Sequence, residues 1–196
     1  MTETDDLKDF ESFIEIFKPG DNLRKPDDET LKLAEESVLP KELIALWKNY
    51  GFGNYGNGLI KVINPFEYAN SLYTWLGGKD ENKLPIFITG FGDIFYYRKL
   101  TDEEDDVSLL DIHYRRIEVC TYSFMDFIED FIVDEEIYED ILKKPLFTEA
   151  FEKLGELSEK EIYLFAPALA LGGSEDVKFI KKGDAITQQQ ILFQMN

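Results

Sequence analysis

The sequence predicts an α+β fold: a single compact domain built on a mainly antiparallel sheet of about five or six strands flanked by helices. Segments with the helical period occupy the beginning and the end of the chain, whereas the middle holds short strand-like segments separated by turns. Short connections between consecutive strands favour antiparallel pairing. No internal repeat, low-complexity block or flexible linker interrupts the sequence, so residues 1–196 are expected to form one structural unit.

Apolar residues at helical spacing predict four helices in the first part of the chain. Pro19-Gly20 ends the first of them, and Pro40 suits the first turn of the third. Asn64 and Pro65 are residue types that favour the N-cap and the first helical position, so the fourth helix is expected to begin there. The helices are expected over residues 7–17, 28–36, 40–50 and 64–76.

The middle of the chain is rich in apolar and β-branched residues and predicts a meander of strands. Gly90-Phe91-Gly92-Asp93 has the composition of a hairpin turn. The acidic run Asp102–Asp106 separates the next two strands. The strands are expected over residues 59–63, 84–89, 94–98, 107–112 and 116–121.

After Ser123 the helical period returns. Ser123 with Asp126 resembles a capping box, Asp134 is placed to cap the following helix, and Asp184 to start the last one. Between these caps we expect a helix over residues 145–154 and two strands over residues 162–166 and 177–181.

The chain is strongly acidic, with 21 Lys and Arg against 40 Asp and Glu, which gives a formal net charge of −19. Such a field repels phosphate backbones and anionic lipid, so we expect no direct binding to nucleic acid or membranes. It accelerates encounter with a basic partner. Solubility alone explains the charge equally well at this stage.

No pattern in the sequence predicts a catalytic, cofactor or metal site. Residues 51–56 match G-x-G-x-x-G, but a helix precedes them and a strand follows, the reverse of the order that binds a dinucleotide. His113 is the single histidine and Cys120 the single cysteine, too few for a zinc site. We therefore predict a protein without enzymatic activity, cofactor or metal.

A surface for a protein partner is the site that the sequence favours. The acidic run lacks the spacing and central glycine of a calcium loop, but it suits a lysine- and arginine-rich partner. Phe95, Tyr96 and Tyr97 are consecutive on one strand, so at least one is expected to leave the core face, and aromatic residues often anchor interfaces. The candidate partner-binding residues are Tyr96, Tyr97, Asp102, Glu103, Glu104, Asp105 and Asp106.

The cytoplasm is the expected compartment. Residues 1–9 are acidic and lack the basic and apolar regions of a signal peptide. No stretch approaches the roughly 18 consecutive apolar residues of a membrane-spanning helix.

Two stretches resemble known families. Residues 39–47 (LPKELIALW), 50–53 (YGFG) and 58–60 (GLI) resemble the opening of GAD-like domains. Residues 162–175, which contain the run FAPALALGG, resemble the C-terminal domain of bacterial immunity proteins paired with type VI secretion DNase effectors. Both are similar in layout to the SUKH group of immunity proteins and cell-wall-assembly regulators. The resemblance implies a SUKH-like fold, with a GAD-like segment at about 10–105 and an immunity-type segment at about 118–194.

The function implied by this resemblance is non-catalytic neutralisation, in which the protein binds a toxin domain and covers its active site. The acidic charge agrees with it, because a nuclease presents a positive surface to nucleic acid. Two alternatives stay open: a non-catalytic scaffold or regulator of cell-wall assembly, and a hydrolase that uses two of the many carboxylates.

Overall fold

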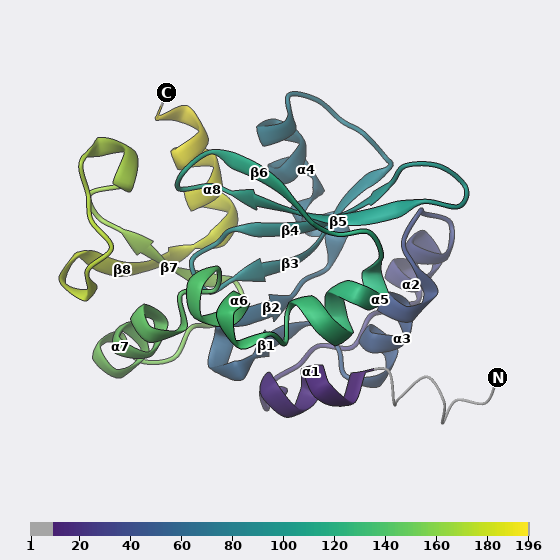
Figure 1. Ribbon diagram of the computed structural model, residues 1–196, viewed down its shortest axis with the longest axis horizontal. Coiled ribbons are helices and arrows are strands. Elements are labelled where there is room, and N and C mark those ends of the chain that lie inside the picture. Colours follow the sequence, from purple (N-terminus) through teal and green to yellow (C-terminus); the bar gives the residue numbers. More distant parts are fainter. Residues whose placement is uncertain (1–9, 196) are drawn as a thin grey trace.

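The computed structural model describes residues 10–195, in which six strands form one antiparallel sheet in sequence order (Figure 1). The α+β class and the meander are therefore confirmed. The start of the helix expected over residues 7–17 lies outside the described residues. The six strands are β1 (Gly53–Tyr55), β2 (Ile60–Val62), β3 (Lys83–Thr89), β4 (Ile94–Lys99), β5 (Asp105–Asp111) and β6 (Arg116–Thr121).

The central strands β3 and β4 are apolar on both faces. Phe87 lies opposite Phe95 and both belong to one buried cluster, whereas their neighbours Ile88 and Ile94 pair within a second cluster. Because successive strand residues point to opposite faces, both faces must be covered to keep these side chains from water. The sheet is consequently the middle of three layers.

Helices provide both covers (Figure 1). The smaller cluster takes residues from the helices α4 (Pro65–Leu76) and α8 (Ala185–Gln194). The larger cluster takes residues from the helices on the other side of the sheet, where a π-helical turn over Phe127–Phe131 follows α5 directly. These helices are α1 (Glu11–Ile16), α2 (Asp28–Glu35), α3 (Lys41–Asn49), α5 (Phe124–Asp126), α6 (Glu135–Asp140) and α7 (Lys144–Leu154). Within residues 10–195 no helix has the length and apolar character needed to cross a membrane.

The helix starts expected from capping residues are confirmed. Asn64 accepts a hydrogen bond from the Phe66 N–H at 3.1 Å, with Pro65 at the first helical position of α4. Ser123 caps α5, Asp134 caps α6 and Asp184 caps α8 through their side-chain oxygens. Each cap satisfies a backbone donor that the first helical turn leaves without a partner.

A second, two-stranded sheet follows α7. It pairs β7 (Glu161–Phe165) with β8 (Ile180–Asp184). The predicted last strand begins three residues later than expected, because Asp176 caps a short 3-10 turn over Val177–Phe179. The Tyr163 N–H donates to the Gly90 carbonyl at 2.8 Å, so β7 packs against the turn between β3 and β4.

The glycine-rich run after α3 contains β1, a strand that the sequence did not predict. Residues 19–24, which we name the strap, run along β1, with Pro19 bridged to Tyr55 and Arg24 bridged to Phe52. A Cβ atom on Gly51 would lie 2.9 Å from the Arg24 carbonyl oxygen, and the φ of Gly51 is +108°. The glycines of this run therefore permit a close backbone approach, and they follow a helix rather than precede one.

The two margins of the main sheet differ. The strap covers the outer edge of β1. At the opposite margin, β6 has β5 as its one strand neighbour among the described residues.

The ring of Phe127 sits at the centre of the larger cluster, 5.1 Å from the ring of Phe95 and 5.7 Å from that of Phe87. Phe127→Ala should lower the free energy of unfolding by about 3–5 kcal/mol, because a large cavity opens between sheet and helices. Urea unfolding measures the loss. Tyr122→Ala, a change at an 82% exposed residue, is the matched control and should leave stability almost unchanged. Equal losses in the two variants would contradict this packing.

Candidate functional site

The acidic run predicted from the sequence divides into an exposed tip and a structural base. Asp102, Glu103 and Glu104 are exposed in the loop between β4 and β5. The Thr101 hydroxyl accepts hydrogen bonds from the Glu103 and Glu104 N–H groups, which orders the loop and turns the three carboxylates toward solvent. We call Asp102–Glu104 the acidic tip.

Asp105 and Asp106 belong to β5 rather than to the loop, so their expected place in an exposed run is wrong. Asp106 is buried and binds Arg98 in a two-pronged ion pair, with its Oδ1 2.7 Å from the arginine Nε. Asp105 accepts a hydrogen bond from the Tyr97 hydroxyl at 2.9 Å. Both carboxylates hold β4 against β5. Removing either partner of these contacts would leave a polar group near the core without a hydrogen-bond partner, which would lower stability.

The predicted exposure of Tyr96 and Tyr97 is also wrong. The side chains are 1% and 2% exposed and lie on opposite faces of β4. Successive side chains of a strand point to opposite faces of the sheet, so one of two neighbouring aromatic residues is exposed only when one face is solvated. Here both faces are covered. Burial, with Asp105 adding to it, raises the pKa of Tyr97 above its ordinary value. Neither residue can contact a partner on this fold.

Among the residues within the strands of the sheet, the large exposed apolar side chains lie on β6, and Tyr122 follows that strand directly. Ile117 is 51% exposed, Val119 is 46% exposed, and Tyr122 is 82% exposed. The sequence carried one signal for them: β6 is the last strand of the meander, and a terminal strand has a neighbour on one side only. Thr121 pairs with Val107 on β5, so Tyr122 leaves the sheet near the base of the acidic tip.

A hydrolase that uses two carboxylates would need them free in a cleft, and the two least exposed carboxylates of one cleft are held in structural contacts. Asp93 and Asp111, together with the exposed Glu118 and Asp140, border a cavity of about 220 Å³. Burial raises the pKa of Asp93, whose Oδ1 accepts from the Ile112 N–H at 3.0 Å. Asp111 accepts from the N–H groups of His113 and Tyr114 and pairs with Arg116 at 3.2 Å. These contacts shape the turn between β5 and β6.

His113 and Cys120 are held in structural positions. His113 is buried, with Nε2 2.9 Å from the Phe91 carbonyl oxygen and its ring against that of Phe165. Burial raises the pKa of the Cys120 thiol to about 12, which disfavours the reactive thiolate at neutral pH. Among residues 10–195, no group of three or more His, Cys, Asp or Glu side chains is arranged to hold a metal ion.

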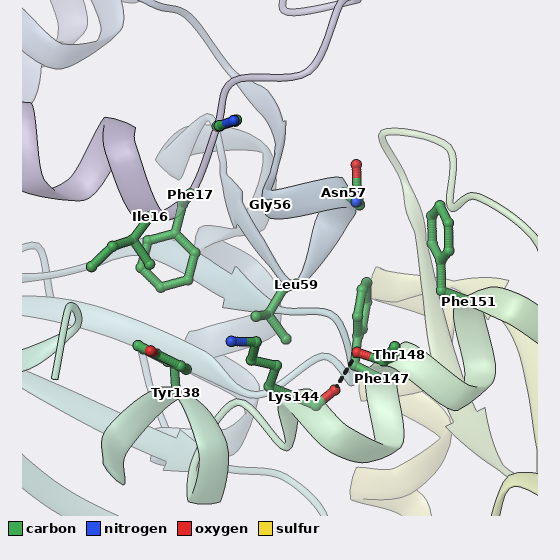
Figure 2. A pocket seen from close by; sticks show the side chains of 11 residues that line it. Ile16, Phe17, Gly56, Asn57, Leu59, Tyr138, Lys144, Phe147, Thr148 and Phe151 are labelled. Atoms are coloured by element: carbon green, nitrogen blue, oxygen red, sulfur yellow. Dashed lines mark hydrogen bonds between the residues drawn. The ribbon is translucent and has the colours of Figure 1, made fainter. Parts of the chain in front are cut away.

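An apolar cleft opens between the N-terminal helix, the β1–β2 turn and α7. It has a volume of about 290 Å³ (Figure 2). Figure 2 shows Phe17, Leu59 and Phe147 around the same space, and the Lys144 ammonium lies 4.4 Å from the ring centre of Tyr138. The cleft can receive an apolar side chain beside a positive charge, but its lining offers no acid–base pair. Its lining residues are Ile16, Phe17, Lys18, Gly56, Asn57, Leu59, Tyr138, Lys144, Phe147, Thr148 and Phe151.

A buried lysine joins β2 to the loop that precedes β7. Lys61 has no exposed surface, and its ammonium donates to the Ser158 carbonyl at 3.0 Å and to the Asn54 side chain. Asn54 in turn donates to the Leu157 carbonyl at 2.6 Å. Burial lowers the pKa of Lys61 to about 7, although nearby glutamates favour the charged form. No sequence pattern indicated this role for Lys61, because a lysine within a short strand ordinarily points to solvent.

The family comparisons divide the chain at the end of β5. Residues 8–110, more than half of the chain, match the family model of the GAD-like domain. The chain belongs to the GAD-like family. Residues 122–196 match the C-terminal model of the type VI secretion immunity protein Tdi1. Together the two matches support a type VI secretion immunity protein, and both resemblances inferred from the sequence are confirmed.

The GAD-like and Tdi1-type segments share one interior. The cleft of Figure 2 takes Phe17 and Leu59 from the first segment and Phe147 from the second. Lys61 and Asn54 likewise bind backbone carbonyls of the second segment. The site residues of this GAD-like protein are therefore placed by both segments together.

A solved structure of similar fold is the crystal structure of Atu4351 from Agrobacterium tumefaciens. It is 16% identical, the match covers 95% of this chain and 89% of that one, and the TM-score is 0.72. At this identity the likeness shows the fold alone. No curated protein matches the chain.

The lowered pKa of Lys61 allows a test of the contacts that this residue makes between the GAD-like and Tdi1-type segments. Between pH 7 and 9 the unfolded chain keeps the Lys61 proton and the folded protein releases it, so the stability of the folded state rises with pH. Relative to Lys61→Met, the unfolding free energy of the wild type should gain about 1 kcal/mol per pH unit over this window. Urea unfolding at pH 7, 8 and 9 measures the gain.

Lys181→Met, at an exposed lysine on β8, is the control and should differ from the wild type by a constant amount over the same window. A constant difference for Lys61→Met as well would show that Lys61 titrates at its ordinary pKa.

Proposed function

We propose that this protein neutralises the toxin domain of a cognate type VI secretion effector by binding it and covering its active site. The observation that carries the proposal is the match of residues 122–196 to the Tdi1 immunity protein. The protein acts as a stoichiometric binder and not as an enzyme. The occupied carboxylates, the buried histidine and the suppressed thiol support that interpretation.

The proposed target is a nuclease. Nucleases need a positive surface to hold phosphate, and a chain with a formal net charge of −19 attracts such a surface over long range. The protein meets the toxin domain in the cytoplasm, where the nucleic acid that must be protected lies. The acidic tip and the exposed residues of β6 are the proposed contact region, in place of the buried Tyr96 and Tyr97.

Gene order is the simplest observation that separates this proposal from a scaffold in cell-wall assembly. A toxin gene that encodes a basic C-terminal domain is expected beside the gene for this protein. An isolated gene among cell-wall functions would favour the scaffold and contradict the immunity role.

Co-expression with the toxin domain should restore growth of a bacterial host that the toxin alone kills. With purified proteins, nuclease activity should fall linearly as this protein is added and end at about one equivalent, because a binder is consumed in the complex. A nuclease assay at fixed toxin concentration measures the end point. Inactivation by a small fraction of one equivalent would instead reveal catalysis, and unimpaired killing would contradict the immunity role.

Removing the charge of the acidic tip should slow association with the toxin domain. The variant Asp102→Asn, Glu103→Gln, Glu104→Gln keeps the loop's size while it removes three charges that face solvent. We expect a several-fold lower association rate constant at low salt and a weaker dependence on salt, with little change in dissociation. Stopped-flow mixing at several ionic strengths measures both.

The matched control removes three exposed charges from helices elsewhere, as Glu11→Gln, Glu15→Gln, Glu149→Gln. Both variants change the net charge from −19 to −16, because each loses three negative charges. Equal rates for the two variants would show that the overall charge steers the toxin and that the tip has no special part.

A further inference from the structure

The outer edge of β6 is open, whereas the chain covers the equivalent edge of β1. The strap pairs through one backbone bridge with Tyr55 of β1 and through a second with Phe52, the residue before β1. No described residue forms a bridge or a ladder with the outer edge of β6. An open edge presents a row of backbone N–H and C=O groups that can pair with another extended chain.

The side chains of β6 suit a pairing strand on one face. Ile117 lies opposite Leu110 and Val119 opposite Ser108, so both point to the face that α4 and α8 cover. These helices do not reach them, and about half of each side chain is exposed. Two β-branched residues at alternate positions of an edge strand form an apolar margin that a neighbouring strand would bury.

The acidic tip beside β6 selects the charge of that neighbour. Glu118 and Arg116 are both exposed on the other face of β6, with Glu118 Oε1 3.9 Å from Arg116 Nη1, and Arg116 also pairs with Asp111 at 3.2 Å. The acidic tip lies three residues beyond Val107, the partner of Thr121, which is about 10 Å along the strand direction. Negative charge therefore borders the edge at the end where the acidic tip lies.

The same charge disfavours a second copy of this chain as the occupant. Two copies would each bring a formal net charge of −19 and would repel one another over long range. Charged residues on an edge strand commonly block pairing between identical molecules. A basic segment meets no such barrier and is attracted.

We propose that the outer edge of β6, over residues 116–119, receives an extended segment of the partner in which basic residues alternate with apolar ones. The segment adds a seventh strand to the sheet. Its apolar side chains cover Ile117 and Val119, and its basic side chains approach Glu118 and the acidic tip. Beyond Val119 the ladder carries a bulge at Cys120, so the regular pairing ends there. That the partner is an effector rests on the proposed function, but the pairing itself does not.

The test uses a synthetic peptide as the probe: seven residues, lysine and valine alternating, with both ends capped. In the full-length protein, alternate amides of residues 116–119 donate to β5, and the others face outward and exchange rapidly with solvent. With the peptide in millimolar excess, the outward amides should exchange at least tenfold more slowly, as measured by NMR. Protection at every second amide is the signature of an added strand.

Two N-methylated peptides provide the control. One carries methyl groups on the valine nitrogens and the other on the lysine nitrogens, and both keep the charge of the probe. Alternate N–H groups of an extended peptide point to opposite edges, and only one edge pairs with β6. One methylated peptide should therefore no longer slow the exchange of the β6 amides, and the other should still slow it. If the peptide leaves β6 exchange unchanged, or if both methylated forms act like the probe, strand addition is overturned.

The double variant Ile117→Thr, Val119→Thr should weaken peptide binding at least fivefold. Leu33→Thr, Ile191→Thr is the matched control at exposed apolar residues of α2 and α8 and should change it less than twofold. Equal effects would overturn the proposal. The same exchange measurement with the effector domain distinguishes strand addition from the immunity role. If the effector is neutralised without protection of the β6 amides, strand addition alone is overturned. If the peptide pairs with β6 but the effector is not neutralised, the immunity role alone is overturned.

Discussion

The burial of β3 and β4 on both faces is the constraint from which the rest of the architecture follows. Phe87 and Phe95 fill one side of these strands, and Ile88 and Ile94 fill the other. An antiparallel sheet commonly leaves one face to water, but this one cannot. The N-terminal helices and α5–α7 must cover one face, and α4 with α8 must cover the other. Because the covers come from both ends of the chain, the GAD-like segment and the Tdi1-type segment complete one another's interior.

This arrangement also decides where a partner can bind. With both faces of the sheet occupied, exposed strand residues occur at the margins, and the strap closes one of the two. Charge follows the same logic: carboxylates inside the sheet, such as Asp106 and Asp111, are paired with arginines, while those of the acidic tip stay in water. The margin at β6 thus combines apolar surface and open backbone groups with the negative charge of the acidic tip at one end, a combination that suits a basic protein partner.

The sequence predicted what depends on neighbours along the chain. The caps at Asn64, Ser123 and Asp184 are local hydrogen bonds, and the hairpin at Gly90–Asp93 is a local turn, so residue types sufficed to find them. Features that depend on the third dimension were missed. Glycine carries no side chain to mark β1, and two helices separate the strap from the strand that it pairs with. Alternation suggested an exposed tyrosine on β4 because a sequence does not reveal that helices from both ends cover both faces.

The most direct measurement is a crystal structure of this protein bound to the effector domain that we propose it neutralises. If the open margin of the sheet is the binding surface, the basic surface of the effector lies over β6 and the acidic tip, and an extended effector segment continues the sheet. The bound protein then also covers the active site of the effector. An interface formed by α2 and α3, or one centred on the cleft of Figure 2 with β6 still open to solvent, would contradict this mode of binding.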